Sequence, residues 1–219
     1  PNKTKLMLVP FYSAEEACQA VSSIFRSGIT PSGLEFMERD ALDWGIKYIE
    51  DISLNIKNDI QAHLLIEVDG NYEELLMQEC EQIFEVMAKY RCDEILIAES
   101  ALQKETLKKL RANIGEAVKS NSIYKEEDTV VPRAELPVLL KGIKEIGTKY
   151  NFRSVCFGHA GDGNFGAQRA ARAVVAPGGG RALRAHALLP AAGCHRRADR
   201  CRRRTHQDGA AERGPRSDG

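Results

Sequence analysis

Residues 62–87, AHLLIEVDGNYEELLMQECEQIFEVM, contain a strand, a turn and a helix in direct succession. The run from Ala62 to Val68 is rich in apolar residues and ends at Asp69-Gly-Asn71, which is typical of a β-strand that leads into a turn. From residue 72 onward the apolar residues recur every three or four positions, and this spacing predicts a one-sided helix. The apolar segment at 94–99 predicts a returning strand, so the stretch as a whole predicts a β-α-β unit.

A similar unit precedes this one. Residues 5–10 form a candidate strand, and Ser13-Ala-Glu-Glu16 predicts a capping box in which the Ser13 hydroxyl and the Glu16 carboxylate satisfy free amides at a helix start. Helical spacing of apolar residues then continues to Gly28, and residues 31–37 predict a second strand. Two such units predict an α+β fold, with a ferredoxin-like antiparallel sheet and helices packed on one face.

The chain continues with further elements of both kinds. The expected elements are a short helix from Asp40, a helix around residues 107–118, a polar loop at 120–131, a helix at 132–150 and a strand at 153–157.

The formal net charge of zero conceals a difference between two parts of the chain. Residues 1–166 contain 19 basic and 27 acidic residues, whereas residues 167–219 contain 12 arginines, no lysine and 4 acidic residues. One interpretation is that this basic tail binds nucleic acid or another acidic surface. Its cysteines and histidines also form a candidate zinc set, although their spacing matches no common zinc finger: Cys194, His195, Cys201 and His206.

We favour a third interpretation of the tail, a shifted reading frame. Arg, Ala, Gly and Pro have GC-rich codons and dominate the tail, whereas the preceding sequence is rich in Lys, Ile, Glu and Asn. The tail has no Ile, Phe, Tyr or Trp and offers no core-forming stripe. We therefore expect a poorly structured segment at residues 165–219 and no nucleic-acid partner.

The remaining composition indicates a cytoplasmic protein. No apolar run reaches the roughly 18 residues of a membrane span, and no signal-peptide pattern follows Pro1. Six cysteines are scattered without pairing spacings, which favours reduced thiols.

Residues 157–164, FGHAGDGN, place three glycines around a histidine, an aspartate and an asparagine. The segment lacks the Lys-Ser/Thr pair of a phosphate loop and has the wrong glycine order for a dinucleotide fingerprint. Its glycines allow the backbone to approach a flat or anionic ligand closely, with His159 and Asn164 projecting from the turn. The alternative is a tight connection between strands that carries a solvated histidine.

This segment resembles the signature G-H-x-G-D-G-N-L-H of the C-terminal domain of FAD-linked oxidases, the family of bacterial glycolate oxidase flavin subunits and D-lactate dehydrogenases. Segments 34–40, 110–117 and 126–133 also resemble that family in order and spacing. The resemblance covers about residues 3–164, so residues 1–164 are expected to form this substrate-side domain, incomplete at its C-terminal end.

The resemblance implies oxidation of a small 2-hydroxy acid, of the glycolate or D-lactate type, by hydride transfer to FAD. It implies a catalytic role for His159, which would also bind a divalent metal such as Zn or Mn. Arg111 would hold the substrate carboxylate, for which a guanidinium fork is suited, and Asn164 and Lys125 would contact substrate. The implied flavin contacts are Gly161, Asp162, Gly163 and Asn164.

The resemblance also implies partners. FAD would be bound mainly by another domain, which we expect to be absent from this chain, and the reduced flavin would pass electrons to an acceptor protein or an iron–sulfur subunit. The second motif histidine is replaced by Gly166, and a later Glu-His pair has no match. We therefore expect the chain to be inactive by itself. Two alternatives stay open: Arg111 as a solvated helix residue, and a stand-alone ferredoxin-like module that binds a small acid without catalysis.

Overall fold

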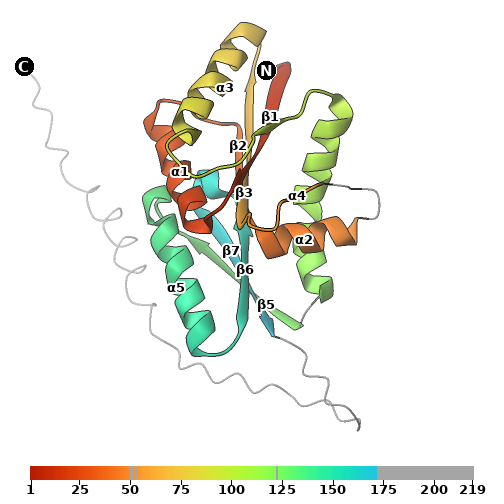
Figure 1. Cartoon of the computed structure of the whole chain (residues 1–219), viewed down its shortest axis with the longest axis vertical. Coiled ribbons are helices and arrows are strands. Elements are labelled where there is room, and N and C mark those ends of the chain that lie inside the picture. The colour runs from red at the N-terminus through yellow and green to blue at the C-terminus, as the bar shows by residue number, and fades with distance from the viewer. Residues whose placement is uncertain (50–51, 53, 122, 172–219) are drawn as a thin grey trace, which may run out of the picture. The chain divides into compact units, whose positions relative to one another are not determined.

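The computed structural model describes residues 1–49, 52, 54–121 and 123–171 (Figure 1), and the side chains of 123–126 and 168–171 lie outside the described set. The described helices are α1 Ala14–Arg26, α2 Arg39–Tyr48, α3 Glu73–Met87, α4 Ala101–Asn121 and α5 Leu136–Lys149. The strands are β1 Lys3–Phe11, β2 Gly33–Glu38, β3 Ala62–Gly70, β4 Leu96–Ile97, β5 Ile123–Val130, β6 Arg153–Gly158 and β7 Asn164–Ala171. Short 3-10 turns occur at Arg133–Glu135 and Ala160–Asp162.

The strands form one seven-stranded sheet in the order β4-β1-β3-β2-β6-β7-β5. All of the strand pairs in this sheet are antiparallel. The first four strands in sequence, with α1 and α3 between them, have the connectivity of the ferredoxin-like motif. The predicted α+β class and ferredoxin-like antiparallel sheet are confirmed, and β6, β7 and β5 extend the sheet on the β2 side.

The helices cover both faces of the sheet, which corrects the expectation of a single covered face. Helices α1, α3 and α5 lie on one side in Figure 1, and α2 and α4 lie on the other. The reason lies in β3, whose successive side chains point to opposite faces and are apolar on each. Leu64 and Ile66 pack with the first group of helices, and Leu65 packs with the second.

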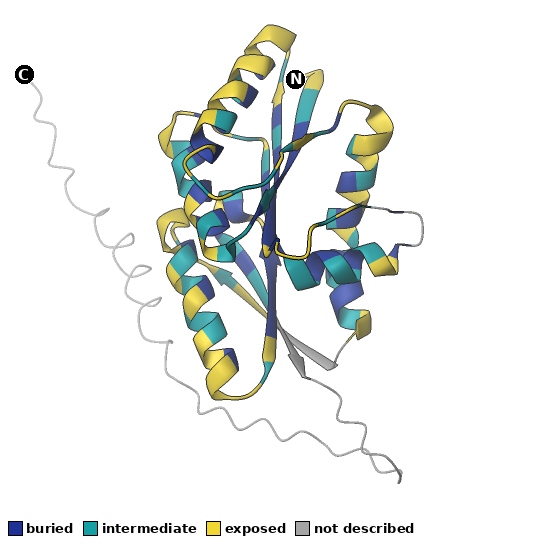
Figure 2. Ribbon diagram, in the orientation of Figure 1, coloured by how far each residue is buried: buried dark blue, intermediate teal, exposed yellow. Residues whose placement is uncertain are grey.

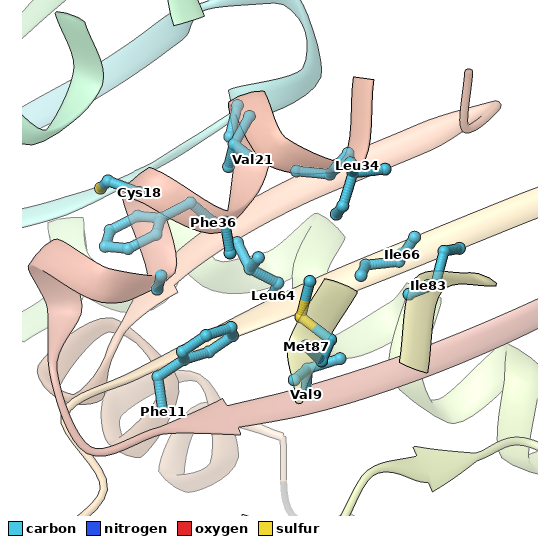
Figure 3. Packing of buried hydrophobic residues seen from close by; sticks show 14 of the residues in the cluster. Val9, Phe11, Cys18, Val21, Leu34, Phe36, Leu64, Ile66, Ile83 and Met87 are labelled. Atoms are coloured by element: carbon cyan, nitrogen blue, oxygen red, sulfur yellow. The ribbon is translucent and has the colours of Figure 1, made fainter. Parts of the chain in front are cut away.

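The core on the α1 and α3 side consists of large apolar residues that are almost fully buried (Figures 2 and 3). Burying each such side chain stabilises the fold by about 1.5–3 kcal/mol. The strand residues of this cluster include Val9, Phe11, Leu34, Phe36, Leu64 and Ile66, and they face Cys18 and Val21 of α1 and Ile83 and Met87 of α3.

The second core fixes α4 against the sheet. Leu107, Leu110 and Ile114 are spaced to form one helix face, and all three are buried. They share a cluster with strand residues that include Met37 and Phe157. Residue 111, which directly follows Leu110, is thereby held at the edge of the helix–sheet contact.

Two local predictions at helix starts and loops need correction. The Ser13 hydroxyl accepts a hydrogen bond from the Glu16 amide, so that half of the capping box is confirmed. The Glu16 carboxylate instead accepts a hydrogen bond from the Arg91 amide, which ties α1 to the segment after α3. The expected polar loop at 120–131 is largely strand β5, because its backbone pairs with β7 along eight residue pairs.

The sheet continues beyond the expected domain end at residue 164. Strand β7 runs to Ala171 and pairs with both β5 and β6. The rest of the Arg-rich tail, including the candidate zinc residues, lies outside the described residues. Among the described residues, Cys18, Cys80, Cys92 and Cys156 are unpaired.

Candidate functional site

One carboxylate contacts both the predicted catalytic residue, His159, and a predicted substrate-binding residue, Arg111. His159 Nδ1 lies 2.6 Å from Glu35 Oε1. Arg111 Nε donates to Glu35 Oε2 at 2.8 Å, and Arg111 Nη2 lies 2.8 Å from the same oxygen. The structure thus brings Arg111 and His159 together through Glu35, a residue that was not among the predicted site residues.

The sheet register explains why these residues meet although they are far apart in the sequence. Phe36 pairs with Gly158 and Met37 with Phe157, and the same register continued by one residue places Glu35 opposite His159. Side chains directly opposite each other on antiparallel strands are close enough to interact.

Arg111, the third residue of the group, lies on helix α4, which packs against the sheet. The Arg111 guanidinium carbon lies 5.8 Å from the centroid of the Phe157 ring, a distance suited to a cation–π contact.

The three side chains differ in exposure. The side chains of Glu35 and Arg111 are each 17% exposed, whereas that of His159 is 60% exposed. The ion pair is therefore sheltered at the helix–sheet contact, and the imidazole borders solvent. The sequence contained a signal for Glu35: it is a charged residue between the apolar Leu34 and Phe36 in the strand GLEFME, whose other charged residue is Glu38.

The glycine-rich turn is shaped by its contact with the segment after β5. Gly163 has a φ of 73°, and a Cβ at this position would lie 2.0 Å from the Val131 carbonyl oxygen. The Val131 amide in turn donates to the Gly163 carbonyl. A residue with a side chain cannot occupy this position without moving the backbone.

Three backbone amides of the turn donate hydrogen bonds to carbonyl groups of the same turn. Asp162 and Asn164 both donate to the His159 carbonyl, and Gly163 donates to the Ala160 carbonyl. A ligand at this turn would therefore meet the Asp162 and Asn164 side chains rather than these amides. Flavin contact by Gly161, Asp162, Gly163 and Asn164 stays a prediction.

A pocket of about 200 Å³ opens beside the turn. His159, Glu35, Gly161 and Asp162 line it, and Arg111 is not among its lining residues. Arg133 forms another part of the wall: its Nε donates to the Gly161 carbonyl, and its guanidinium stacks on Phe25 at 3.8 Å from the ring centroid. The pocket thus offers two cationic or hydrogen-bonding groups, Arg133 and His159, beside the carboxylates of Glu35 and Asp162.

The remaining predicted residues lie along β5 and β7. Asn164 is half-buried at the start of β7 and pairs with Val130. Gly166 pairs with Phe157 on one side and Asp128 on the other. The backbone of Lys125 pairs with Arg169, and the Lys125 side chain lies outside the described residues.

The described residues do not fit a resident divalent metal. No three His, Cys, Asp or Glu side chains among them are grouped closely enough to hold an ion. Stable metal sites need about three or four protein ligands. His159 is the predicted ligand, and Glu35 already occupies its Nδ1. A metal role for His159 stays a prediction.

A larger groove of about 650 Å³ lies along α1 and α5 and contains none of the predicted site residues. At its floor the buried Glu38 carboxylate accepts hydrogen bonds from Lys144 Nζ at 2.7 Å and from the Cys156 amide at 2.6 Å. Burial raises the pKa of Glu38, and Lys144 opposes this shift. Burial also raises the pKa of the Cys18 and Cys156 thiols, which makes them poor nucleophiles.

Comparison with known proteins gives the class. Residues 1–172 match the family described as FAD linked oxidases, C-terminal domain. The chain therefore belongs to the FAD-linked oxidases and contains their C-terminal domain, and the family predicted from the sequence is confirmed. The family implies FAD as cofactor and a separate FAD-binding domain.

Within this family, the chain is similar to two kinds of curated protein, a glycolate oxidase subunit and a D-lactate dehydrogenase. The chain is 32% identical over 166 residues to the glycolate oxidase subunit GlcD of Escherichia coli, covering 75% of this chain and 32% of that protein. It is 29% identical over 168 residues to a D-lactate dehydrogenase of Anaerostipes hadrus, covering 75% of this chain and 35% of that protein. The chain thus spans about a third of the length of these curated relatives.

Solved structures support the fold. A 4-ethylphenol oxidase from Gulosibacter chungangensis superposes with a TM-score of 0.53 at 8% identity, covering 78% of this chain and 39% of that one. An alkyldihydroxyacetonephosphate synthase superposes with a TM-score of 0.50 at 14% identity, covering 77% and 36%. Within the described part of the chain, no helix has the length and apolar character needed to cross a membrane.

Proposed function

We propose that this chain forms the substrate side of an FAD-dependent enzyme that oxidises a small 2-hydroxy acid, with glycolate and D-lactate as the first candidates. The observation that carries the proposal is the contact of Glu35 with both His159 and Arg111. This contact supports the proposal because it joins an imidazole, a group suited to accept a proton, to a guanidinium, a group suited to bind a carboxylate, through one side chain. A 2-hydroxy acid has its hydroxyl on the carbon next to its carboxylate, and therefore needs both groups within a short span.

Each side chain has a chemical role in this proposal. Arg111 uses Nε and Nη2 on Glu35, which leaves Nη1 to donate to the substrate carboxylate. His159 accepts the proton of the substrate hydroxyl as the hydroxyl carbon loses its hydride and becomes the carbonyl carbon of a 2-oxo acid. Bound FAD supplies the hydride acceptor for this reaction. Asn164 and Lys125 are further proposed substrate contacts.

The described residues fit one wall of a flavin site. The pocket beside His159 is about 200 Å³, below the 300–1,000 Å³ typical of small-molecule sites, so it does not enclose a molecule as large as FAD. We therefore propose that Gly161, Asp162, Gly163 and Asn164 contact the flavin while the separate FAD-binding domain holds most of the cofactor. No step in the proposal depends on a metal.

The test is an assay of the full-length protein, with its FAD-binding domain. We expect a yellow protein that reduces a dye acceptor when glycolate or D-lactate is added. Arg111→Met should raise KM strongly, and His159→Gln should lower kcat. Arg153→Met is the matched control, because Arg153 pairs with Asp40 and packs on Trp44 away from the pocket.

Three outcomes decide between the alternatives. A flavin-loaded protein without activity on any 2-hydroxy acid would contradict the proposal. Acid binding without flavin reduction would favour the non-catalytic binding module. An equal effect of Arg153→Met and Arg111→Met would show that Arg111 has only a structural role.

A further inference from the structure

We infer that Glu35 is a positioning residue that locks His159 in its Nδ1–H tautomer, so that the unprotonated Nε2 is the atom presented to the substrate. The same carboxylate fixes Arg111, so the two substrate-binding groups are set by one side chain. The catalytic purpose of this arrangement rests on the function proposed above. The tautomer of His159, however, can be measured in this chain without any reaction.

The tautomer follows from the hydrogen-bonding capacities of the three groups. The Glu35 carboxylate is an anion beside a guanidinium, and a carboxylate anion can only accept hydrogen bonds. Its Oε2 accepts from Arg111, and its Oε1 lies 2.6 Å from His159 Nδ1, so Nδ1 must be the donor in that contact. A neutral imidazole carries one N–H, and Nε2 therefore has a free lone pair.

The Glu35 end of this contact is sheltered from water, whereas the imidazole is exposed. The Glu35 side chain is 17% exposed, and the Phe157 ring flanks the Arg111 guanidinium on the sheet. Charge-assisted hydrogen bonds in such sheltered surroundings are about twice as strong as neutral ones. The exposed part of the imidazole is left to the pocket, which His159 lines together with Glu35 and Arg133.

The direct test is the tautomer of His159 in this chain. The protein is labelled with ¹⁵N-histidine, and long-range proton–nitrogen spectra are recorded at mildly alkaline pH, where imidazoles are neutral. The chain has five histidines, and His159→Gln identifies the His159 signals. We expect a protonated Nδ1 and an unprotonated Nε2. Because this readout needs no variant at position 35, it stands even if a Glu35 variant fails to fold.

The variants test the cause. Glu35→Gln should lower the ratio of the Nδ1–H to the Nε2–H tautomer by about tenfold or more, because an amide can donate as well as accept. Glu67→Gln is the matched control: Glu67 bridges the sheet to Lys108 of α4 at 2.7 Å in the same way but does not contact His159. Arg111→Met should retain the Nδ1–H form, since the carboxylate remains.

The outcomes are separable from those of the proposed function. A wild-type His159 in the Nε2–H form, or a Glu35→Gln spectrum identical to wild type, would overturn the inference whatever the enzyme assay shows. A locked Nδ1–H tautomer in a protein that oxidises no 2-hydroxy acid would leave the inference intact and contradict the proposed function alone.

Discussion

Lys144 Nζ lies 2.7 Å from the Oε2 atom of Glu38 and also donates to the Ser154 carbonyl, so one partly exposed lysine on α5 supports a buried carboxylate at the end of β2. The Glu38 carboxylate has one further donor, the Cys156 amide. Burial raises its pKa, and the nearby ammonium is the main influence in the opposite direction. An uncompensated charge in such a position costs much more than a surface charge.

Replacing this lysine should therefore destabilise the domain. Lys144→Met removes the counter-charge and leaves the buried Glu38 carboxylate with only an amide donor. We expect a loss of about 2 kcal/mol in the free energy of unfolding, less than for a fully buried pair because Lys144 is partly exposed. Urea denaturation measures it. Lys141→Met, at an exposed position one turn earlier in the same helix, should change stability by less than about 0.5 kcal/mol. Equal effects of the two variants would exclude a special role for Lys144.

His63 should make the fold sensitive to mild acid. Burial, and to a lesser extent Arg39, lowers the pKa of His63 to about 4, and its Nδ1 is buried without a partner among the described residues. Since the folded-state pKa lies below the ordinary value of about 6.5, the unfolded chain binds the proton more tightly. The contribution of His63 to stability is therefore complete above about pH 6.5 and is lost as the pH falls toward 4.

The expected loss from this residue is about 2 kcal/mol between pH 7 and pH 5. His63→Leu removes the titrating group and fills the site with an apolar side chain. The variant should lose less stability than wild type over the same pH interval, as measured by urea denaturation at each pH. Parallel losses in the two proteins would show that other groups determine the acid sensitivity.

The elements of the fold follow largely from local patterns, whereas the site does not. The apolar run in residues 62–68 with its following turn, and the helical spacing after residue 72, predicted β3 and α3 because each pattern lies within a few residues. The coverage of both sheet faces was missed, although the unbroken run Leu64-Leu65-Ile66 is a signal of a strand buried on both sides. Strand β5 was missed because its sequence, IYKEEDTV, is polar. It forms one edge of the sheet and pairs only with β7.

The Glu35 contact could not be deduced from spacing in the sequence. Glu35 lies in β2, Arg111 in α4, and His159 directly after β6, and they meet only because β2 pairs with β6 and α4 packs across that pair. The resemblance to a family supplied Arg111 and His159 individually. It did not supply the register that places one carboxylate between them.

Gly163 should tolerate no side chain. Gly163→Ala introduces a Cβ at a φ of 73° and within 2.0 Å of the Val131 carbonyl oxygen. We expect a loss of about 2 kcal/mol or more, because the left-handed backbone is unfavourable for alanine and the turn must shift away from Val131. The matched control is Gly142→Ala in α5, where a Cβ meets nothing within 4 Å. That variant should gain about 0.5–1 kcal/mol. A similar, small effect at both glycines in thermal unfolding would contradict this account of the turn.

A histidine at position 166 should strengthen divalent-metal binding by adding a second imidazole near His159. Continuing the β6–β7 register, His159 faces Asn164 and lies diagonally from Gly166, a relation that long side chains on one sheet face can span. A Cβ at 166 would lie 3.1 Å from the Phe157 carbonyl oxygen, which a small local adjustment relieves. Gly166→His should therefore raise the affinity for Zn²⁺ by about tenfold or more in isothermal titration, since a second imidazole joins the first. Adding His159→Gln to this variant should abolish the gain. If the double variant binds Zn²⁺ as tightly as Gly166→His, then His159 is not a ligand and the predicted metal role of this histidine is wrong.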